Sequence, residues 1–256
     1  MTSLCSGAVM AVSPQPEHAR LIQRLGTIAV LTDPEKQAIA DLPLRIRDFK
    51  ENTDLVTEGD YPSECCMVVA GFVFRYKLLG RGRRQIFSFH LPGDIPDLQS
   101  LHLAVMDHNL GALTPGRAAY IPHAALRDLT ERHPNLASIL WRDTLIDSAV
   151  FREWLASVGR RSARQRVAHL ICEVTVRMRA LDLITDHAFN MPVTQAELGD
   201  ALGLSTVHIN RVLQAMRRED LLTWRGTALL VLDWERLKAV GDFDAAYLHL
   251  LADPFA

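Results

Sequence analysis

The feature that most constrains this chain is the segment 194–213, whose pattern is that of two helices joined by a tight turn. Thr194 is followed three residues later by Glu197, a capping box that predicts the start of a helix. Gly203 can adopt a positive φ angle and would end this helix, and Ser205 can cap a second one. The segment therefore predicts a helix-turn-helix.

The second predicted helix has two different faces. Its apolar positions recur at helical spacing and are expected to face inward: Ile209, Val212, Leu213 and Met216. The opposite face is short and polar, and it suits a helix that reads base edges in the DNA major groove. From it we expect base contacts by Thr206, Val207, Asn210, Arg211 and Gln214 and, with neighbouring residues, DNA-backbone contacts by Thr194, Ser205, His208, Arg217 and Arg225.

An ordinary helical hairpin with a solvated face is the alternative to this interpretation. Two features favour DNA binding. Gly199 lies where the two helices would cross at close range, and a bulky side chain there would hold them apart. Residues 221–232 follow with two short apolar segments around Gly226, which predicts a β-hairpin, the wing of a winged helix-turn-helix. Arg225 at its tip would meet phosphate groups.

Composition supports this interpretation only when it is divided along the chain. A chain of 256 residues with 48% hydrophobic and 23% charged residues is typical of a globular protein of one to three domains. The net charge is −2, but residues 160–225 contain ten Arg and no Lys against seven Asp and Glu. The basic charge is thus located with the predicted motif, where phosphate contacts require it.

Targeting and chemical motifs point away from other classes of protein. No apolar run is as long as a membrane span, and the first ten residues lack the basic residues of a signal peptide, so we expect a cytoplasmic protein that binds no membrane. We expect no enzyme, because neither a nucleophile elbow nor a phosphate-binding Gly loop is present.

No cofactor or metal is expected, although an alternative stays open. Cys5, Cys65, Cys66 and Cys172 lack the spacing of a zinc site. A haem-, metal- or redox-responsive protein could instead sense through the thiols of residues 65 and 66 or through His90, His102, His108 and His123. Surface histidines and idle buried thiols are the simpler interpretation, since no pair of histidines shows ligand spacing.

The first half of the chain predicts a mostly β domain after a disordered lead at residues 1–17. Two short helices are expected within residues 18–42, the second opened by a capping box at Thr32 and Glu35. Short apolar segments then alternate with turns and predict a closed or rolled antiparallel sheet. The expected strands are residues 44–46, 54–56, 67–70, 72–76 and 85–89.

Residues 134–158 predict a long helix whose apolar stripe is broader than one neighbouring domain needs. We therefore expect it to form a dimer interface through Leu136, Ile139, Ile146, Val150 and Trp154. The alternative is a helix buried wholly within its own subunit. Gly159 is expected to end the helix, Arg160 and Arg161 to form a hinge, and Ser162 with Gln165 to open the next helix.

This order of elements resembles the Crp/Fnr family of bacterial transcription regulators. The resemblance is carried by residues 194–222, by Thr57-Glu58-Gly59-Asp60, by Gly71 before the Phe-Arg-Tyr strand and by Phe89-His90-Leu91-Pro92-Gly93-Asp94. It implies an α+β protein: a β-roll sensor domain at 18–133, a dimerisation helix at 134–158 and a winged helix-turn-helix domain at 160–256. It also implies a homodimer that binds a two-fold symmetric DNA operator, with RNA polymerase as a further partner.

Two departures from the family pattern affect the expected ligand and operator. Members that bind cyclic AMP use a Gly-Glu pair and then an Arg that clamps the phosphate. The corresponding segment offers Leu98, Gln99, Ser100, His108 and Asn109 as pocket residues, but no Arg before Arg117, so we expect that cyclic AMP is not the effector. Val207 stands where the family often has Glu, which predicts a different half-site. A regulatory subunit acting only through protein contacts remains the alternative function.

Overall fold

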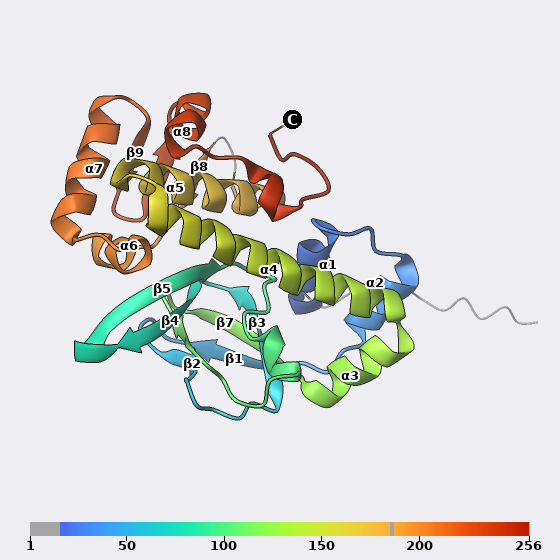
Figure 1. Ribbon diagram of the computed structural model, residues 1–256. Coiled ribbons are helices and arrows are strands. Elements are labelled where there is room, and N and C mark those ends of the chain that lie inside the picture. The colour runs from blue at the N-terminus through green and yellow to red at the C-terminus, as the bar shows by residue number, and fades with distance from the viewer. Residues whose placement is uncertain (1–15, 185–186, 256) are drawn as a thin grey trace, which may run out of the picture.

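The computed structural model describes residues 16–184 and 187–255. In Figure 1 the strands of the N-terminal half lie below the long helix α4, and the C-terminal helices lie above one end of it. Small helices from the N-terminus flank the other end of α4. The expected α+β architecture, with a β-roll, a long helix and a C-terminal helix-turn-helix, is confirmed.

Two short helices precede the roll, as predicted. They are α1 (Pro16–Gly26) and α2 (Asp33–Ala40). The capping box of α2 is present, since the backbone N–H of Thr32 donates to Oε2 of Glu35 at 2.8 Å. Residues 1–15 of the predicted lead lie outside the described residues, and residues 16 and 17 already belong to α1, so the predicted boundary was two residues late.

The roll consists of two antiparallel sheets. One has the order β1 (Arg45–Phe49), β7 (Gly116–Pro122), β3 (Glu64–Ala70), and the other β2 (Asp54–Val56), β6 (Asn109–Ala112), β4 (Val73–Leu79), β5 (Arg83–His90). Short 3-10 turns η1 (Gly80–Gly82) and η2 (Leu98–Leu101) interrupt the connections. Five of these strands were predicted. β6 and β7 were not, because their glycine and alanine residues have weak strand propensity.

Position within the sheet explains why β7 forms in spite of this composition. It is the central strand of its sheet, paired with both β1 and β3, and Ala118 and Ala119 are completely buried. Small residues are also needed for close packing here. A Cβ atom on Gly116 would lie 2.2 Å from the carbonyl oxygen of Ala70. Tertiary pairing thus overrides local propensity in this strand.

The roll is followed by α3 (His123–Arg132) and α4 (Pro134–Arg160). The prediction that Gly159 ends the long helix was wrong, because the helix continues through Arg160 and Arg161 is the first residue outside it. The guanidinium of Arg161 pairs with Glu153 at 2.6 Å, which fixes the chain where a hinge was expected. Ser162 and Gln165 then form the predicted capping box of the next helix.

The C-terminal part is a winged helix-turn-helix with an added tail. Its helices are α5 (Ala163–Ala180), α6 (Gln195–Leu202), α7 (Thr206–Arg218) and α8 (Trp234–Gly241), followed by the 3-10 turn η3 (Ala245–Leu248). Its three-stranded antiparallel sheet has the order β8 (Ala188–Asn190), β10 (Ala228–Val231), β9 (Leu222–Arg225). The tail returns to the first helix, where the backbone N–H of Leu251 donates to the carbonyl of Thr27 at 2.9 Å.

The roll and the C-terminal part share one hydrophobic core. Phe89 from β5, Trp154 from α4 and Ile171 from α5 belong to the same cluster of buried side chains. A polar contact lies beside it, because Nε of Arg84 on β5 donates to Oδ2 of Asp200 on α6 at 2.8 Å. The helix-turn-helix is therefore packed against the roll within one subunit. Within the described residues, no helix is both long and apolar enough to cross a membrane.

Candidate nucleic-acid interface and effector pocket

Side-chain caps and a left-handed glycine build the helix-turn-helix. The backbone N–H of Glu197 donates to Oγ1 of Thr194 at 3.2 Å, and the N–H of Thr194 donates to Oε2 of Glu197 at 2.7 Å. Gly203 ends α6 at a φ of 65°, and Ser205 caps α7 by accepting from the N–H of His208 at 3.3 Å. These contacts use the side chains of Thr194 and Ser205, two predicted backbone-contact residues, although both remain exposed.

Gly199 is required by close packing, but its partner differs from the prediction. A Cβ atom at this position would lie 2.5 Å from the carbonyl oxygen of Leu204, in the turn rather than on the second helix. The N–H of Leu204 in return donates to the carbonyl of Gly199 at 3.1 Å. The turn is therefore held directly against α6, which fixes where α7 begins.

The faces of α7 are distributed as the sequence predicts. Ile209, Val212, Leu213 and Met216 are buried. Of the expected base-reading residues Thr206, Val207, Arg211 and Gln214 are exposed, as is His208. Asn210 is only half-buried, because its Nδ2 donates to Oε1 of Gln195 at 3.2 Å and its Oδ1 accepts from Gln214 at 3.3 Å. The sequence pattern did not reveal this polar chain between α6 and α7.

The wing lies directly behind α7. Trp224 on β9 and Leu229 on β10 are buried. Arg225, in contrast, is exposed next to Gly226, whose φ is 59°. Arg217 was predicted to contact DNA phosphates. In the structure its Nη2 donates to the carbonyl of Trp224 at 2.6 Å, so this side chain ties α7 to the wing.

The five residues predicted for the effector pocket do not form one site. Leu98 and Gln99 line a cavity of about 60 Å³ between the roll, α1, α4 and α5. Oγ of Ser100 lies 3.0 Å from Nε2 of His123, beneath the roll surface. His108 pairs with Asp107, and Asn109 accepts from the N–H of Glu58, both away from that cavity.

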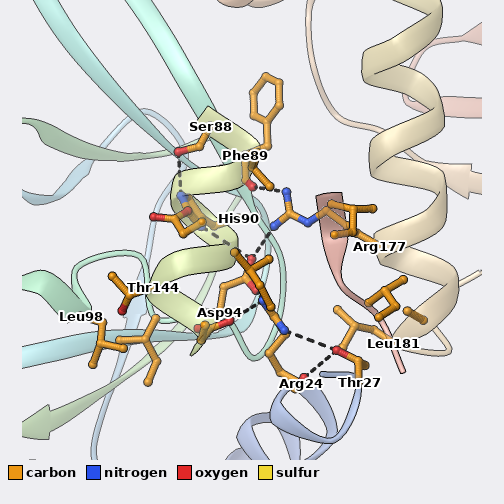
Figure 2. A pocket seen from close by; sticks show the side chains of 18 of the residues that line it. Arg24, Thr27, Ser88, Phe89, His90, Asp94, Leu98, Thr144, Arg177 and Leu181 are labelled. Carbon is orange, nitrogen blue, oxygen red and sulfur yellow. Dashed lines mark hydrogen bonds and ion pairs between the residues drawn. The ribbon is translucent and has the colours of Figure 1, made fainter. Parts of the chain in front are cut away.

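The cavity contains arginines that the sequence analysis missed. They are Arg24 from α1, Arg75 from β4 and Arg177 from α5, of which Arg24 and Arg177 are labelled in Figure 2. Each pairs with a carboxylate: Arg24 with Asp94 and Asp143, Arg75 with Asp147, and Arg177 with Asp94. None of the three lies in the segment that follows the Pro-Gly-Asp turn, since Arg24 and Arg75 precede the turn and Arg177 comes far after it. Arg75 in the apolar strand Phe72–Tyr76 was the available signal, because a charge inside such a strand is expensive to bury.

The residues predicted for the dimer interface are already buried within one subunit. Leu136, Ile139, Ile146, Val150 and Trp154 are between 1% and 8% exposed in a single subunit. The first three belong to the core shared with α1 and the roll, and the last two to the core shared with α5. The stripe is broad because α4 covers two parts of its own chain, so these residues are unavailable to a second subunit.

A different face of α4 is open. Trp141, Leu145 and Leu155 are 62%, 48% and 75% exposed. The spacings from 141 to 145, 148, 152 and 155 alternate between four and three residues, the pattern of a helix that packs along another helix. Ser148 and Arg152 complete this stripe, which we call the open α4 stripe.

His90, His108, His123, Cys65 and Cys66 are buried in the fold, whereas His102 is exposed. Burial lowers the pKa of His90 to about 4, and Nε2 of this ring lies 2.8 Å from Oγ of Ser88. Cys65 and Cys66 point into different cores, as adjacent strand residues should, and burial raises the pKa of both thiols. Among residues 16–184 and 187–255, no three His, Cys, Asp or Glu side chains are grouped as metal ligands.

Comparisons with known proteins agree with this geometry. The sequence model of a cyclic nucleotide-binding domain matches residues 46–133, and that of a Crp-like helix-turn-helix domain matches residues 165–240. The transcriptional activator protein FnrL of Cereibacter sphaeroides is 25% identical over 209 residues, covering 80% of this chain and 84% of that protein. The nitrogen fixation regulation protein FixK of Rhizobium meliloti is 26% identical, covering 72% of this chain and 80% of FixK.

A solved structure shares the fold over most of the chain. FixK2 from Bradyrhizobium japonicum superposes with a TM-score of 0.72 at 24% identity, covering 80% of this chain and all of that one. These relatives are named as transcriptional activators and regulators, not as enzymes.

Proposed function

Because the chain belongs to the Crp/Fnr family of transcription regulators, we propose that it binds a two-fold symmetric DNA operator in a sequence-specific manner as a homodimer. The observation that carries this proposal is the outer face of α7. It is polar and exposed, it carries Arg211, and caps and the wing hold it in place. Such a helix fits the major groove, with the wing against the phosphate backbone.

Arg211 and Val207 would supply the base contacts that distinguish this operator. Arg211 offers a bidentate donor pair for guanine O6 and N7. Val207, 70% exposed, offers only methyl groups, which fit the methyl group of thymine and cannot accept from a cytosine amino group. The apolar exposure of Val207 costs free energy in water and is offset only when a partner covers it. We therefore expect a half-site that contains thymine next to the guanine read by Arg211.

The homodimer would form along the open α4 stripe. Two copies packed through Trp141, Leu145 and Leu155 would remove three large apolar side chains from water. A two-fold axis between the paired helices would also place two α7 helices on one side of the dimer. Half-sites about 34 Å apart would match this arrangement.

Sedimentation tests the dimer. Leu145→Glu and Leu155→Glu together should give monomers that lose operator binding, because two charges would be buried in the interface. The matched control is Leu103→Glu, which is 57% exposed in the loop after η2 and should leave a dimer. Ile146 and Val150 are unsuitable for this test, because they are buried in their own subunit and charges there would unfold it. A monomeric wild-type protein contradicts the proposal.

Selection of binding sites from random DNA tests base reading. The wild-type protein should enrich a palindrome, and Arg211→Ala should lose the preference at one base pair of each half-site. The control is Arg132→Ala on the exposed surface of α3, which should enrich the same palindrome as the wild type. Failure of the wild-type protein to enrich any sequence would favour the alternative, a regulator that acts only through protein contacts.

We further propose that cyclic AMP does not control DNA binding. The cavity of about 60 Å³ beside Arg24, Arg75 and Arg177 has room for only a few waters, so a cyclic nucleotide would not fit there. Titration calorimetry with cyclic AMP and cyclic GMP should give no saturable heat, and micromolar binding that changes operator affinity contradicts this. RNA polymerase remains the expected protein partner, and the cytoplasm, where the DNA lies, the expected compartment.

A further inference from the structure

The cavity at the junction of the roll and the C-terminal part is lined by three arginines and three aspartates. Its volume is about 60 Å³, and its walls come from α1, the end of β5, the segment to η2, α4 and α5 (Figure 2). Since Arg177, Leu181 and Leu250 are among its lining residues, it is a site between domains and is not enclosed by the roll alone.

One side of the cavity is basic. Nε of Arg24 and Nη2 of Arg177 both lie 2.8 Å from the carboxylate of Asp94, so two helices converge on one acid (Figure 2). Although burial alone would raise it, Arg177, His90 and Arg24 hold the pKa of Asp94 well below its usual value. Asp94 is thus ionised, and this side of the cavity holds two guanidinium groups around one carboxylate, although Arg24 is shared with Asp143.

The opposite side, on α4, is acidic. Asp143 and Asp147 are four residues apart and share one face of the helix. Each is paired through one oxygen only: Oδ1 of Asp143 accepts from Arg24 and Oδ2 of Asp147 from Arg75, both at 2.6 Å. Burial, together with the neighbouring carboxylates, raises the pKa of Asp143 although Arg24 pairs with it. This wall would be stabilised by a bound cation.

We propose that the junction cavity binds a small zwitterion, an amino acid of the size of glycine or alanine. The ammonium group would donate to the second oxygens of Asp143 and Asp147, and the carboxylate would accept from the guanidinium groups across the cavity. The size agrees: one water needs about 10–15 Å³ of such volume, so the cavity accommodates roughly four to six waters or a ligand of similarly few atoms.

The charge balance of the lining selects a zwitterion over a simple ion. Three Arg face three Asp, and His90 is neutral at pH 7 because burial lowers its pKa to about 4. Adding a lone anion or cation would leave one largely buried charge without a partner, which is costly. A zwitterion adds one charge of each sign beside an existing opposite charge, so the total remains balanced.

Binding would be transmitted to the DNA-binding part through Arg177. This residue lies on α5 and joins it to the roll, because Nη1 donates to the carbonyl of Phe89 at 3.0 Å and Nη2 to Asp94. Nη1 also lies 3.5 Å from the buried carboxylate of Glu173. A ligand carboxylate that competes for Arg177 would loosen its bond to Asp94 and shift α5. This regulatory part rests on the DNA-binding function proposed above.

Titration calorimetry of the full chain without DNA tests the site. Glycine and L-alanine should bind saturably, whereas acetate and methylammonium, which each carry one half of the charge, should not. L-Leucine should fail because of its size. Asp143→Asn should weaken binding by about tenfold or more, as expected for the loss of one buried charge partner. The matched control is Asp128→Asn, in the exposed pair with Arg132, which should bind as the wild type does.

A second variant keeps the proposal testable if Asp143→Asn does not fold. Thr144 lines the cavity and uses its hydroxyl only on the carbonyl of Leu140, so Thr144→Leu fills the space without removing a charge. This variant should lose ligand binding and keep its circular dichroism spectrum. Undiminished binding by Thr144→Leu overturns the location.

The outcomes separate the site from the proposed function. If glycine and alanine give no heat with the wild-type protein, the cavity holds only water and this inference is overturned, whatever the DNA results. If acetate binds as tightly as glycine, the site is a plain anion site and the zwitterion is wrong. If the zwitterion binds, operator affinity measured with and without it should differ by about 5- to 150-fold, the usual range of coupling between sites, and an unchanged affinity overturns the regulatory part alone.

Discussion

The recognition helix and the junction cavity both depend on arginine, but they hold it in opposite states. Arg211 on α7 is exposed, with its guanidinium turned away from the subunit core. Arg24 is 15% exposed at its side chain and lies between Asp94 and Asp143. An exposed guanidinium is available to a partner outside the chain, whereas a buried one has its partner within it. The position of the carboxylates, more than the number of arginines, therefore distinguishes a DNA-reading surface from an internal junction.

Removing one buried carboxylate should cause the largest loss in the free energy of unfolding. Asp94→Ala would leave Arg24 and Arg177 without their shared partner, and losing one member of a buried ion pair costs about 3–5 kcal/mol. The free energy of unfolding in urea measures this loss. Asp128→Ala, in an exposed pair on α3, should stay within about 0.5 kcal/mol of the wild type. Equal effects of the two substitutions would abolish the distinction between buried and exposed charge.

A second buried carboxylate should make stability depend on pH. Burial raises the pKa of Asp97 to about 7, although the N–H of Cys66 donates to its Oδ1 at 2.7 Å. Because this value lies above the unfolded value of 3.8, the folded protein holds a proton that the unfolded chain has lost between these pH values. The resulting stability is fully present below pH 3.8 and is lost as pH rises through 7.

Comparison with Asp97→Asn isolates this contribution. The free energy of unfolding of the wild type minus that of the variant should fall by up to about 1.4 kcal/mol per pH unit between pH 4 and pH 7. His90 has the opposite tendency, since its pKa is lowered to about 4, but it is present in both proteins and cancels in the difference. A difference that stays constant with pH contradicts the raised pKa of Asp97.

The exposed arginine of α7 should act on DNA affinity and leave the fold intact. Arg211→Ala should cost about 1–3 kcal/mol on the preferred operator and much less on other sequences. Its free energy of unfolding should match that of the wild type, because the side chain lies outside the core. Equal losses on preferred and random DNA would mean that Arg211 contacts phosphate, and that Thr206 or Gln214 reads the bases.

The wing should give the smallest and least selective effect. Arg225→Ala should weaken binding to all DNA sequences alike, and it should reduce the slope of log affinity against log salt by about one. Fluorescence anisotropy with operator and random duplexes at several salt concentrations measures both quantities. If affinity were lost for the operator alone, Arg225 would contact bases and not the DNA backbone.

The helix-turn-helix could be predicted almost residue by residue because its signals are local. The caps at Thr194 and Ser205 and the turn at Gly203 each depend on neighbours within a few residues, and the structure contains all three. The junction could not be predicted in this way. Arg24, Asp94, Asp143 and Arg177 come from four distant segments, and nothing in their own neighbourhoods indicates that they meet.

The long helix shows a third case, in which the predicted apolar stripe is present but is covered by parts of the same chain. The apolar stripe through Leu136, Ile146 and Trp154 exists, but two parts of the same chain cover it. Periodicity identifies a buried face without identifying what buries it. Only the three-dimensional arrangement shows that Trp141, Leu145 and Leu155 are the apolar residues still uncovered.

The bond between Leu251 and Thr27 has a consequence for how the protein is made. The chain is synthesised from its N-terminus, so α1 leaves the ribosome long before the segment that packs against it exists. Leu250, which lies beside the core around α1, is made only after the roll and the helix-turn-helix. Contacts between such distant residues close slowly and leave apolar surface uncovered in the meantime. The N-terminal half thus completes its packing only after the segment around Leu250 and Leu251 has been made, and a substitution there that breaks these contacts would leave the core around α1 incompletely covered.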